Sequence, residues 1–347
     1  MSPIKVGVLG ATGMVGQRLV QLLDRHPWFI VTELAASERS SGKTYAGAMQ
    51  GRWKLTTPIP EAMARLTVKE CAPGLDCQMV FSALDADVAG PIEMAFAKAG
   101  YVVSSNARNY RMEPDVPLII PEVNADHLGL IPQQKKNRGW KGFIVTDPNC
   151  TTIMLTLALK PLARFGLRTV MMTSMQALSG AGYPGVASLD SVDNVIPYIG
   201  GEEDKVESET LKLLGQIKDG KVEPAAIGVS AQCNRVNVTD GHTECVSVKL
   251  DQKVSRDDLA RAIEEFNPLK GLGLPTAPSP PLILRPETDR PQPRLDRDLG
   301  KGMTVSVGRL RPCPVLDYKF VVMGHNTIRG AAGAAILNAE LMKARGY

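Results

Sequence analysis

Cys150 is the residue whose type and surroundings most clearly suggest chemistry. It follows Asp147-Pro148-Asn149 and precedes an apolar run that predicts a helix, so it should lie at a helix N-terminus. The helix dipole and the free N–H groups of a first turn stabilise a thiolate and can hold an oxyanion. The sequence therefore indicates a cysteine nucleophile, with a small packed side chain as the alternative. The remaining cysteines are expected to be such bystanders: Cys71, Cys77, Cys233, Cys245 and Cys313.

A cysteine nucleophile needs a partner that moves protons, and the chain has only four histidines. His26 and His127 are expected to be caps or packed residues, and His325 a capping or cofactor-side residue. His242 lies at the mouth of a predicted strand, seven residues after Arg235, so this loop offers a carboxylate clamp and a proton-transfer group together. A loop histidine with no catalytic role is the alternative.

A glycine turn, Gly10-Ala11-Thr12-Gly13-Met14-Val15-Gly16, follows one predicted strand and opens the next predicted helix. Such a turn lets backbone N–H groups approach a pyrophosphate at the positive end of a helix. The spacing is G-x-x-G-x-x-G, not the strict G-x-G-x-x-G, and a plain strand-to-helix turn is the alternative. Its place inside a βαβ unit favours a dinucleotide site.

The segment after the second predicted strand bears on the choice of nicotinamide cofactor. NAD enzymes usually place an acidic residue there for the ribose hydroxyls, whereas NADP enzymes need donors and positive charge for the 2′-phosphate. Ser37, Arg39, Ser40 and Lys43 favour NADP, and Glu38 is the exception in the segment. A polar turn without a ligand is the alternative.

The elements that must position these groups fall into two units. In the first, short β-branched strands alternate with helices, which predicts a parallel sheet. The strands are expected at 4–9, 30–35, 77–82 and 101–104, and the helices at 15–23 and 91–99.

After residue 150 a helix (151–164, interrupted by Pro161) precedes longer, alternating strands at 170–177, 246–250 and 303–309, which suit a mixed sheet covered on one face. An Ala-rich helix at 330–344 is expected to return to the first unit. The fold class is therefore α/β. A Rossmann-like NADP-binding domain comprises residues 1–148 and 326–347, and an α+β catalytic and oligomerisation domain comprises residues 149–325.

Composition limits the class of protein. The chain has 347 residues, 44% hydrophobic and 22% charged, with a formal net charge of +4, which is ordinary globular composition and gives little support for a nucleic-acid partner. No apolar stretch is long enough for a membrane span, and the polar start lacks a signal region. The six cysteines lack metal-ligand spacing, so we expect reduced thiols in a cytoplasmic protein with no metal site.

Five motifs occur in order: DPNCTT, QALSGAGYPG, EEDK, Arg235 with His242, and GHNTIRGAAG. Together they resemble aspartate-β-semialdehyde dehydrogenases of the fungal and archaeal branch, over essentially the whole chain. The resemblance implies NADPH-dependent conversion of L-aspartyl-4-phosphate to L-aspartate-4-semialdehyde through a cysteine acyl-thioester, in lysine, methionine, threonine and isoleucine biosynthesis. It also implies inorganic phosphate as a ligand and a homodimer or homotetramer.

The resemblance implies roles for individual residues as well, with Cys150 as the nucleophile and His242 as the general acid/base. Substrate and phosphate would be held by Arg111, Asn149, Gln176, Glu202, Lys205 and Arg235. The resemblance implies these cofactor contacts: Thr12, Gly13, Met14, Val15, Ser37, Ser40, Ser82, Ser179, Gly180, Asn326 and Thr327. The two turn segments add Gly10 and Arg39 to this set. Glu202 and Lys205 are three apart and project from one helix face. The sequence leaves open whether Glu202 or Glu203 meets the substrate ammonium.

Related reductases are alternatives, acting on N-acetylglutamyl phosphate or malonyl-CoA. An ammonium receptor at Glu202 and a carboxylate receptor at Arg235 favour a free amino acid over an N-acetylated one. Coenzyme A would need basic groups, which only the predicted loop at 135–141 offers. An alternative of another class is a silent NADP-binding sensor, in which Cys150 would not be nucleophilic.

Overall fold

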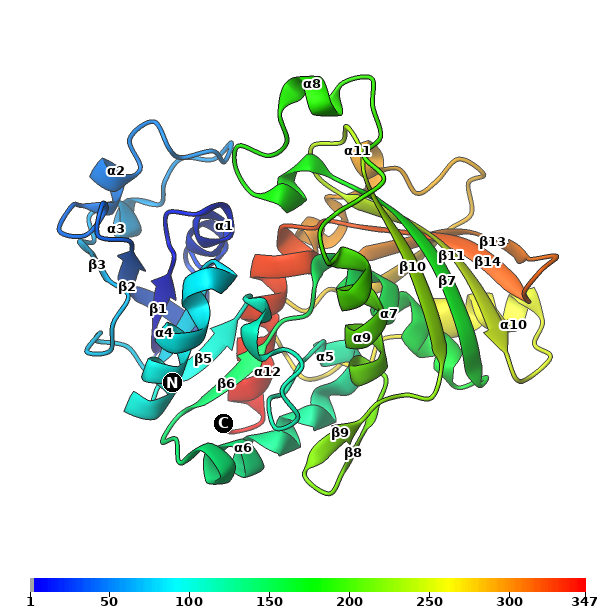
Figure 1. The fold of residues 1–347 in the computed structure, drawn as a ribbon, viewed down its shortest axis with the longest axis horizontal. Coiled ribbons are helices and arrows are strands. Elements are labelled where there is room, and N and C mark those ends of the chain that lie inside the picture. Colours follow the sequence, from blue (N-terminus) through cyan, green and yellow to red (C-terminus); the bar gives the residue numbers. More distant parts are fainter. Residues whose placement is uncertain (1–2) are drawn as a thin grey trace.

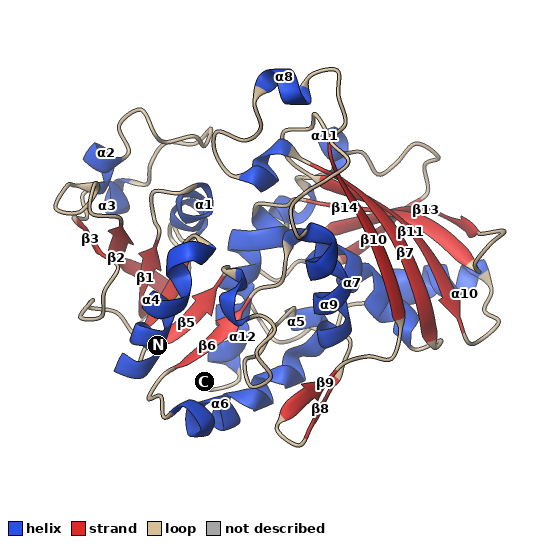
Figure 2. Cartoon of the chain, in the orientation of Figure 1, coloured by secondary structure: helices blue, strands red, loops and turns tan. Residues whose placement is uncertain are grey.

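The computed structural model describes residues 3–347. Two six-stranded sheets lie side by side, and the last helix, α12 (Gly333–Ala344), runs between them (Figure 1). The short strands of the first sheet occupy one side of the molecule and the long strands of the second sheet the other (Figure 2).

All neighbouring strands of the first sheet are parallel. In spatial order they are β3 (Val68–Glu70), β2 (Phe29–Ala36), β1 (Ile4–Leu9), β4 (Met79–Ser82), β5 (Val102–Ser105) and β6 (Phe143–Thr146). Apart from the edge strand β3, these strands are mostly buried, as apolar runs in a sheet covered on both faces should be. The order 3-2-1-4-5-6 is the doubly wound arrangement, in which ligands bind where the strand order reverses, between β1 and β4. The predicted Rossmann-like sheet is confirmed.

The helices of this part are α1 (Met14–Leu22), α2 (Tyr45–Ala48), α3 (Glu61–Ala64), α4 (Ala86–Ala99), α5 (Pro121–Asn124) and α6 (Ile131–Arg138). The prediction that Pro91 starts a helix is wrong, because α4 begins five residues earlier and carries Pro91 inside. Its end was predicted well, since Gly100 takes a φ of 106° that ends the helix. The prediction of a basic loop at 135–141 is also wrong, because residues 135–138 belong to α6.

The second sheet is mixed, as predicted. In spatial order its strands are β10 (Gly228–Arg235), β7 (Leu167–Gln176), β11 (His242–Leu250), β14 (Tyr318–Gly324), β13 (Val305–Pro312) and β12 (Leu282–Arg285). The outer pairs, β10 with β7 and β12 with β13, are parallel, and the inner pairs are antiparallel. β12 lies in the proline-rich stretch 275–293, in which the sequence analysis predicts no strand.

Helices cover one face of this sheet and leave the other face open. The main covering helices are α7 (Cys150–Ala163), α9 (Glu202–Leu213) and α10 (Arg256–Glu264). This part of the chain also contains the short helices α8 (Ser188–Ser191) and α11 (Pro293–Asp296) and a small hairpin of β8 (Gln216–Lys218) and β9 (Lys221–Glu223). Apolar residues of α7, such as Leu155 and Leu159, pack with Val246 and Val322 of the sheet in one core. On the open face Met171 remains 52% exposed.

α12 returns to the first sheet, as expected from its composition. Ile336 and Leu337 share a core with Val6 and Val8 of β1, and Met303 from the second part of the chain joins the same core. A π-helical turn, Ile328–Ala332, precedes α12. It is held by a buried bidentate ion pair between Arg329 and Glu122, with Nη–Oε distances of 2.9 and 2.7 Å.

Within residues 3–347, the helices are each too short or too polar to cross a membrane. The same residues contain no group of three or more His, Cys, Asp or Glu side chains placed to hold a metal ion.

Candidate active site

Three neighbouring strands bring polar side chains to one edge of the second sheet. Arg235 ends β10, Gln176 ends β7 in parallel register beside it, and His242 begins the antiparallel β11. Alternation along a strand sends these three side chains to the helix-covered face. All three are buried, with exposed fractions of 7%, 1% and 0%. Residues spread over 67 positions of sequence, from 176 to 242, therefore converge because of strand register.

The N-terminus of α7 meets this edge. Asn149 caps the helix, because its Oδ1 accepts hydrogen bonds from the N–H groups of Thr151 (2.9 Å) and Thr152 (3.2 Å). Cys150 is the first helical residue, as predicted. A Cβ atom at Gly330, in the π-helical turn, would lie 2.7 Å from the Cβ of Cys150, so only glycine lets this turn pack against the cysteine.

Cys150 and His242 form the predicted pair, with 3.3 Å between Sγ and Nε2. The other ring nitrogen, Nδ1, accepts a hydrogen bond from the N–H of Ala177 at 3.0 Å. Because a nitrogen that accepts a hydrogen bond carries no proton, the neutral ring holds its proton on Nε2. The histidine therefore presents an N–H group to the sulfur.

At Cys150, burial opposes the effect of the helix N-terminus on the thiol. Burial, and next the Glu202 carboxylate, raise the pKa of the Cys150 thiol to about 12, while Arg111, the Thr151 N–H and Arg235 lower it. Burial first, and then Arg235 and His325, lower the pKa of His242 to about 3. Desolvation outweighs the helix dipole here, so the resting pair consists of a thiol and a neutral imidazole.

Arg235 is fixed close to this pair. Its Nη1 donates to the carbonyl of Ala177 at 2.7 Å. A Cβ at Gly180 would lie 2.7 Å from that Nη1 and 3.1 Å from Cε1 of His242. Gly180 thus borders both side chains of the site. Gln176, the other strand-end residue, donates from Nε2 to Oγ of Ser174 at 3.2 Å.

The two neighbouring glutamates of α9 point to different places. Glu202 is 5% exposed, accepts from Nδ2 of Asn149 at 2.8 Å, and pairs with Nζ of Lys205 at 3.1 Å. Glu203 accepts instead from the backbone N–H of Cys233 in β10, at 2.9 Å. The carboxylate that faces the cysteine is therefore that of Glu202.

Arg111 reaches the site already paired. Its Nη1 donates to Oε1 of Glu209 at 2.9 Å and its Nη2 to the carbonyl of Asn106 at 2.8 Å, and buried Nε has no partner. Oε2 of Glu209 also accepts from the backbone N–H of Asn149, at 2.6 Å. The sequence analysis missed Glu209, although it lies seven residues after Glu202, two turns along the same face of α9.

A cavity of about 710 Å³ lies at the carboxyl ends of β1, β2 and β4, the predicted dinucleotide position. Five of the predicted cofactor residues line it: Gly10, Thr12, Gly13, Ser37 and Arg39. Gly10 has a φ of 73°, and a Cβ there would lie 2.5 Å from the carbonyl oxygen of Ala83. The first turn of α1 has no side-chain cap and no acidic residue, so its N–H groups are free to bind a pyrophosphate.

Arg52 also lines this cavity, and its Nη1 lies 3.5 Å from Oγ of Ser40. With Arg39 it gives the cavity a second cation. No local motif marks Arg52 in the sequence, because a loop of the fold carries it there.

The other predicted cofactor residues lie around the cavity or between it and the cysteine. Met14 and Val15 belong to the first turn of α1, and Ser40 and Ser82 are buried. Asn326 is nearer the active site, since it donates from Nδ2 to Oγ of Ser179 (2.8 Å) and its Oδ1 accepts from the N–H of Gly241 (2.8 Å). Thr327 follows it, with Oγ1 3.4 Å from Nδ1 of His325.

A doubly wound sheet with a dinucleotide cavity and a part-buried cysteine–histidine pair defines a class: nicotinamide-dependent oxidoreductases with a cysteine nucleophile. Comparison with known proteins makes this specific. Residues 5–131 match the family model of the semialdehyde dehydrogenase NAD binding domain, and residues 159–329 match that of the semialdehyde dehydrogenase dimerisation domain.

Relatives match along the full chain. An aspartate-semialdehyde dehydrogenase of Archaeoglobus fulgidus is 58% identical over 338 residues, 97% of each chain. A crystal structure of the Candida albicans enzyme with NADP is 46% identical, with a TM-score of 0.91 over 99% of each chain. A Vibrio cholerae aspartate-semialdehyde dehydrogenase II is 26% identical, with a TM-score of 0.78 over the whole of both chains. The chain belongs to the aspartate-semialdehyde dehydrogenase family. The interpretation as an NADP-dependent oxidoreductase of this kind is confirmed.

Proposed function

We propose that the protein reduces L-aspartyl-4-phosphate to L-aspartate-4-semialdehyde through a thioester on Cys150. The observation that carries this proposal is the 3.3 Å contact between Sγ of Cys150 and Nε2 of His242, flanked by Glu202 and Arg235. A free amino acid presents an ammonium and a carboxylate, and these two side chains are of the right charge to receive them. Arg235 offers the planar fork that suits a carboxylate.

The alternative acyl substrates are less well supported. An N-acetylated substrate has no ammonium for Glu202. For a coenzyme A thioester, the basic residues of α6 are a poor receptor because Arg138 is already paired with Asp115 and Glu113. A silent sensor would not need a cysteine in contact with a histidine.

Binding places the acyl carbon against Cys150, with the phosphoryl group near Lys205 and Arg111. As the carbon–sulfur bond forms, the acyl–phosphate bond breaks, and the thiol proton ends on the departing phosphate, so that thiol and acyl phosphate become thioester and hydrogen phosphate. The N–H groups at the start of α7 are suited to stabilise the intermediate oxyanion.

The cofactor residues fit NADP, because the glycine turn leaves room for a pyrophosphate and two arginines border the cavity. NADPH bound there supplies the hydride that reduces the thioester. Hydride addition would leave a thiohemiacetal oxyanion. His242 would then give its Nε2 proton to sulfur as the carbon–sulfur bond breaks and the C=O bond re-forms, and it would regain a proton from solvent, so that one hydride and one proton reduce the thioester. Aldehyde leaves, and Cys150 returns to the thiol.

NADPH oxidation assayed with L-aspartyl-4-phosphate, N-acetylglutamyl phosphate and malonyl-CoA tests the substrate. We expect turnover with the first alone. Cys150→Ser should lower kcat by about a thousandfold or more while NADPH affinity, measured by fluorescence titration, stays unchanged. His242→Ala should lower kcat by about 10²–10⁴-fold. Full activity in Cys150→Ser would contradict the thioester, and faster turnover of another substrate would contradict the assignment.

We also propose the division into an NADP-binding domain (1–148 and 326–347) and a catalytic domain (149–325), as the sequence predicts. A homodimer or homotetramer fits the dimerisation domain of the matching family model and the uncovered face of the second sheet. A cytoplasmic location fits the six free cysteines.

A further inference from the structure

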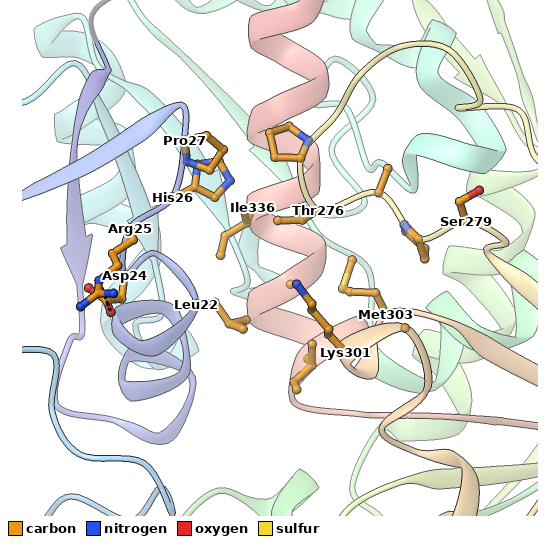
Figure 3. A pocket seen from close by; sticks show the side chains of 16 residues that line it. Leu22, Asp24, Arg25, His26, Pro27, Thr276, Ser279, Lys301, Met303 and Ile336 are labelled. Carbon is orange, nitrogen blue, oxygen red and sulfur yellow. Dashed lines mark ion pairs between the residues drawn. The ribbon is translucent and has the colours of Figure 1, made fainter.

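A second cavity, of about 480 Å³, lies where the two halves of the chain meet (Figure 3). It shares no lining residue with the dinucleotide cavity, and Cys150 does not line it. Its walls come from the end of α1, the loop 275–279, the turn 300–303, and α12. The floor is apolar, since Met303, Ile328 and Ile336 are buried beneath it. A cavity of this size with an apolar floor is suited to a small organic molecule.

Lys301 brings a positive charge to this cavity from an unusual backbone. Its φ is 59°, a conformation that non-glycine residues rarely adopt, and Gly300 and Gly302 beside it are also left-handed. In Figure 3 the Lys301 side chain extends from its turn into the space between Leu22 and Met303. Backbone strain of this kind is typically retained at ligand clamps. Arg25, also lining the cavity, has a φ of 54°.

A polar group without a partner lies in the opposite wall. The buried Oγ1 of Thr276 has no hydrogen-bond partner, although it can both donate and accept. The backbone N–H of Thr276 is engaged by Glu340, at 3.0 and 3.1 Å from its two carboxylate oxygens. Nε2 of His26 lies 2.8 Å from the same carboxylate, while its Nδ1 accepts from the N–H of Phe29. Glu340 and His26 therefore satisfy each other, which leaves Lys301 and the Thr276 hydroxyl for a ligand.

We propose that this cavity is an effector site for a small organic monocarboxylate with an apolar body. The carboxylate would pair with Lys301 and accept from the Thr276 hydroxyl, and the body would lie on Ile336 and Met303. The charges at the rim favour a monoanion, because Asp24 and Arg25 largely offset each other (3.9 Å apart) and Lys301 leaves a net charge of one. A phosphate dianion would find too few donors.

Such a ligand would couple to the cofactor cavity. α1 begins at the glycine turn of that cavity and ends at Leu22, in the wall of this one. Ile328, in its floor, follows the Asn326–Thr327 turn that contacts Ser179 and Gly241. A molecule bound between Leu22 and Lys301 bridges the two halves and so fixes α1 relative to the active site. Because the two binding equilibria are linked, the ligand must then change the affinity for NADPH by the same factor by which NADPH changes the affinity for the ligand.

Isothermal titration of the full-length protein with 4-methylpentanoate, 4-methylpentanol and 4-methylpentylamine tests the proposal. We expect saturable binding of the acid only. Lys301→Gly, which keeps the left-handed backbone, should weaken it about tenfold or more, because a charge-assisted hydrogen bond is lost. Arg309→Gly is the matched control, since Arg309 is also basic with a φ of 59° and lies outside the cavity. Ala277→Trp, which fills the space, should abolish binding.

NADPH titrated with and without saturating acid gives the second readout, and we expect a change in Kd of about fivefold or more. Three results would overturn the proposal. The first is the absence of saturable acid binding, and the second is an NADPH Kd that the acid does not change. The third is equal acid binding in wild type and Lys301→Gly, which would place the acid on Arg235 instead.

Discussion

Opposing influences act on the sulfur of Cys150. Burial and Glu202 hold the pKa of the thiol at about 12, while Arg111, the Thr151 N–H and Arg235 act against them. A substrate ammonium beside Glu202 would neutralise the carboxylate that raises this pKa. A thiol that stays protonated before substrate binds would react slowly with other electrophiles.

The reaction of Cys150 with iodoacetamide measures this state directly. Because the thiolate is the reacting species and the pKa lies near 12, the rate in free protein should rise about tenfold per pH unit from pH 7 to 10, without a plateau. Mass spectrometry of the Cys150 peptide gives the rate, and Cys150→Ser identifies background from other thiols. A plateau below pH 9 would show that the helix N-terminus prevails over burial.

Glu202 and Glu203 form a natural pair for a comparison. Glu202→Gln should lower kcat/KM by about 10–100-fold, because a charge-assisted contact to the substrate ammonium is lost. The same change should speed alkylation of Cys150, since it removes a charge that raises the thiol pKa. Glu203→Gln keeps an acceptor for the Cys233 N–H and should leave both quantities near wild type. The reverse order of effects would assign the ammonium to Glu203.

At the scale of elements, Asp147 joins β6 to the returning helix α12. Its Oδ1 accepts from Nδ2 of Asn338, and its Oδ2 is buried without a partner. Burial raises the pKa of Asp147 to about 8, against the lowering effect of Asn338. The folded chain therefore keeps this carboxyl protonated at neutral pH, where the unfolded chain ionises it.

This mismatch predicts a pH-dependent effect of Asp147→Asn on the free energy of unfolding. A raised folded pKa contributes stability below the unfolded pKa near 4, and this is lost as the pH rises toward 8. The variant should therefore be more stable than wild type at pH 7.5 by an amount on the order of a few kcal/mol, with the difference diminishing at pH 4.5. Urea unfolding at both pH values measures it. Asp126→Asn, the same change at an exposed position, should show no such trend.

β1 and the end of α4 could be predicted, from a continuous apolar run and from a helix-ending glycine. β6 and β14 were missed although each carries an apolar run, because a short apolar run also suits a buried helix segment. β10 was missed because Gly228–Arg235 alternates apolar and polar residues weakly, and β12 because prolines flank it. The start of α4 was misplaced because Pro91 sits inside the helix, where proline is usually excluded.

The active site, too, could be predicted only where a local sequence signal marks a residue. Cys150 is marked locally by its cap, and its partners were named from the family resemblance, but their convergence depends on strand register. Register sets Arg235 beside Gln176 and brings His242 to the same edge. The thiol's raised pKa could not be predicted, because burial is a property of the tertiary structure. Arg52 and Glu209 carry no motif of their own and were found only from their contacts.

On the scale of the whole molecule, the two faces of the second sheet have different environments. α7 and α9 cover the face that carries Gln176, Arg235 and His242. The other face has a groove of about 450 Å³ and exposes apolar and small polar side chains, among them Met171 and Cys245. A broad sheet face of this kind is an expected site for a second copy of the chain.

Met171→Lys tests this assembly without touching the catalytic face. In wild type, light scattering should give at least twice the chain mass of 37.4 kDa. An ammonium on β7 would have to be buried without a partner in the interface, at a cost of several kcal/mol, so the variant should shift toward the single-chain mass. Leu272→Lys makes the same change at a loop position that is 40% exposed and should leave the mass unchanged. If Met171→Lys keeps the wild-type mass, the open sheet face is not the subunit interface. If it dissociates with its Cys150–His242 chemistry intact, each chain carries a complete active site.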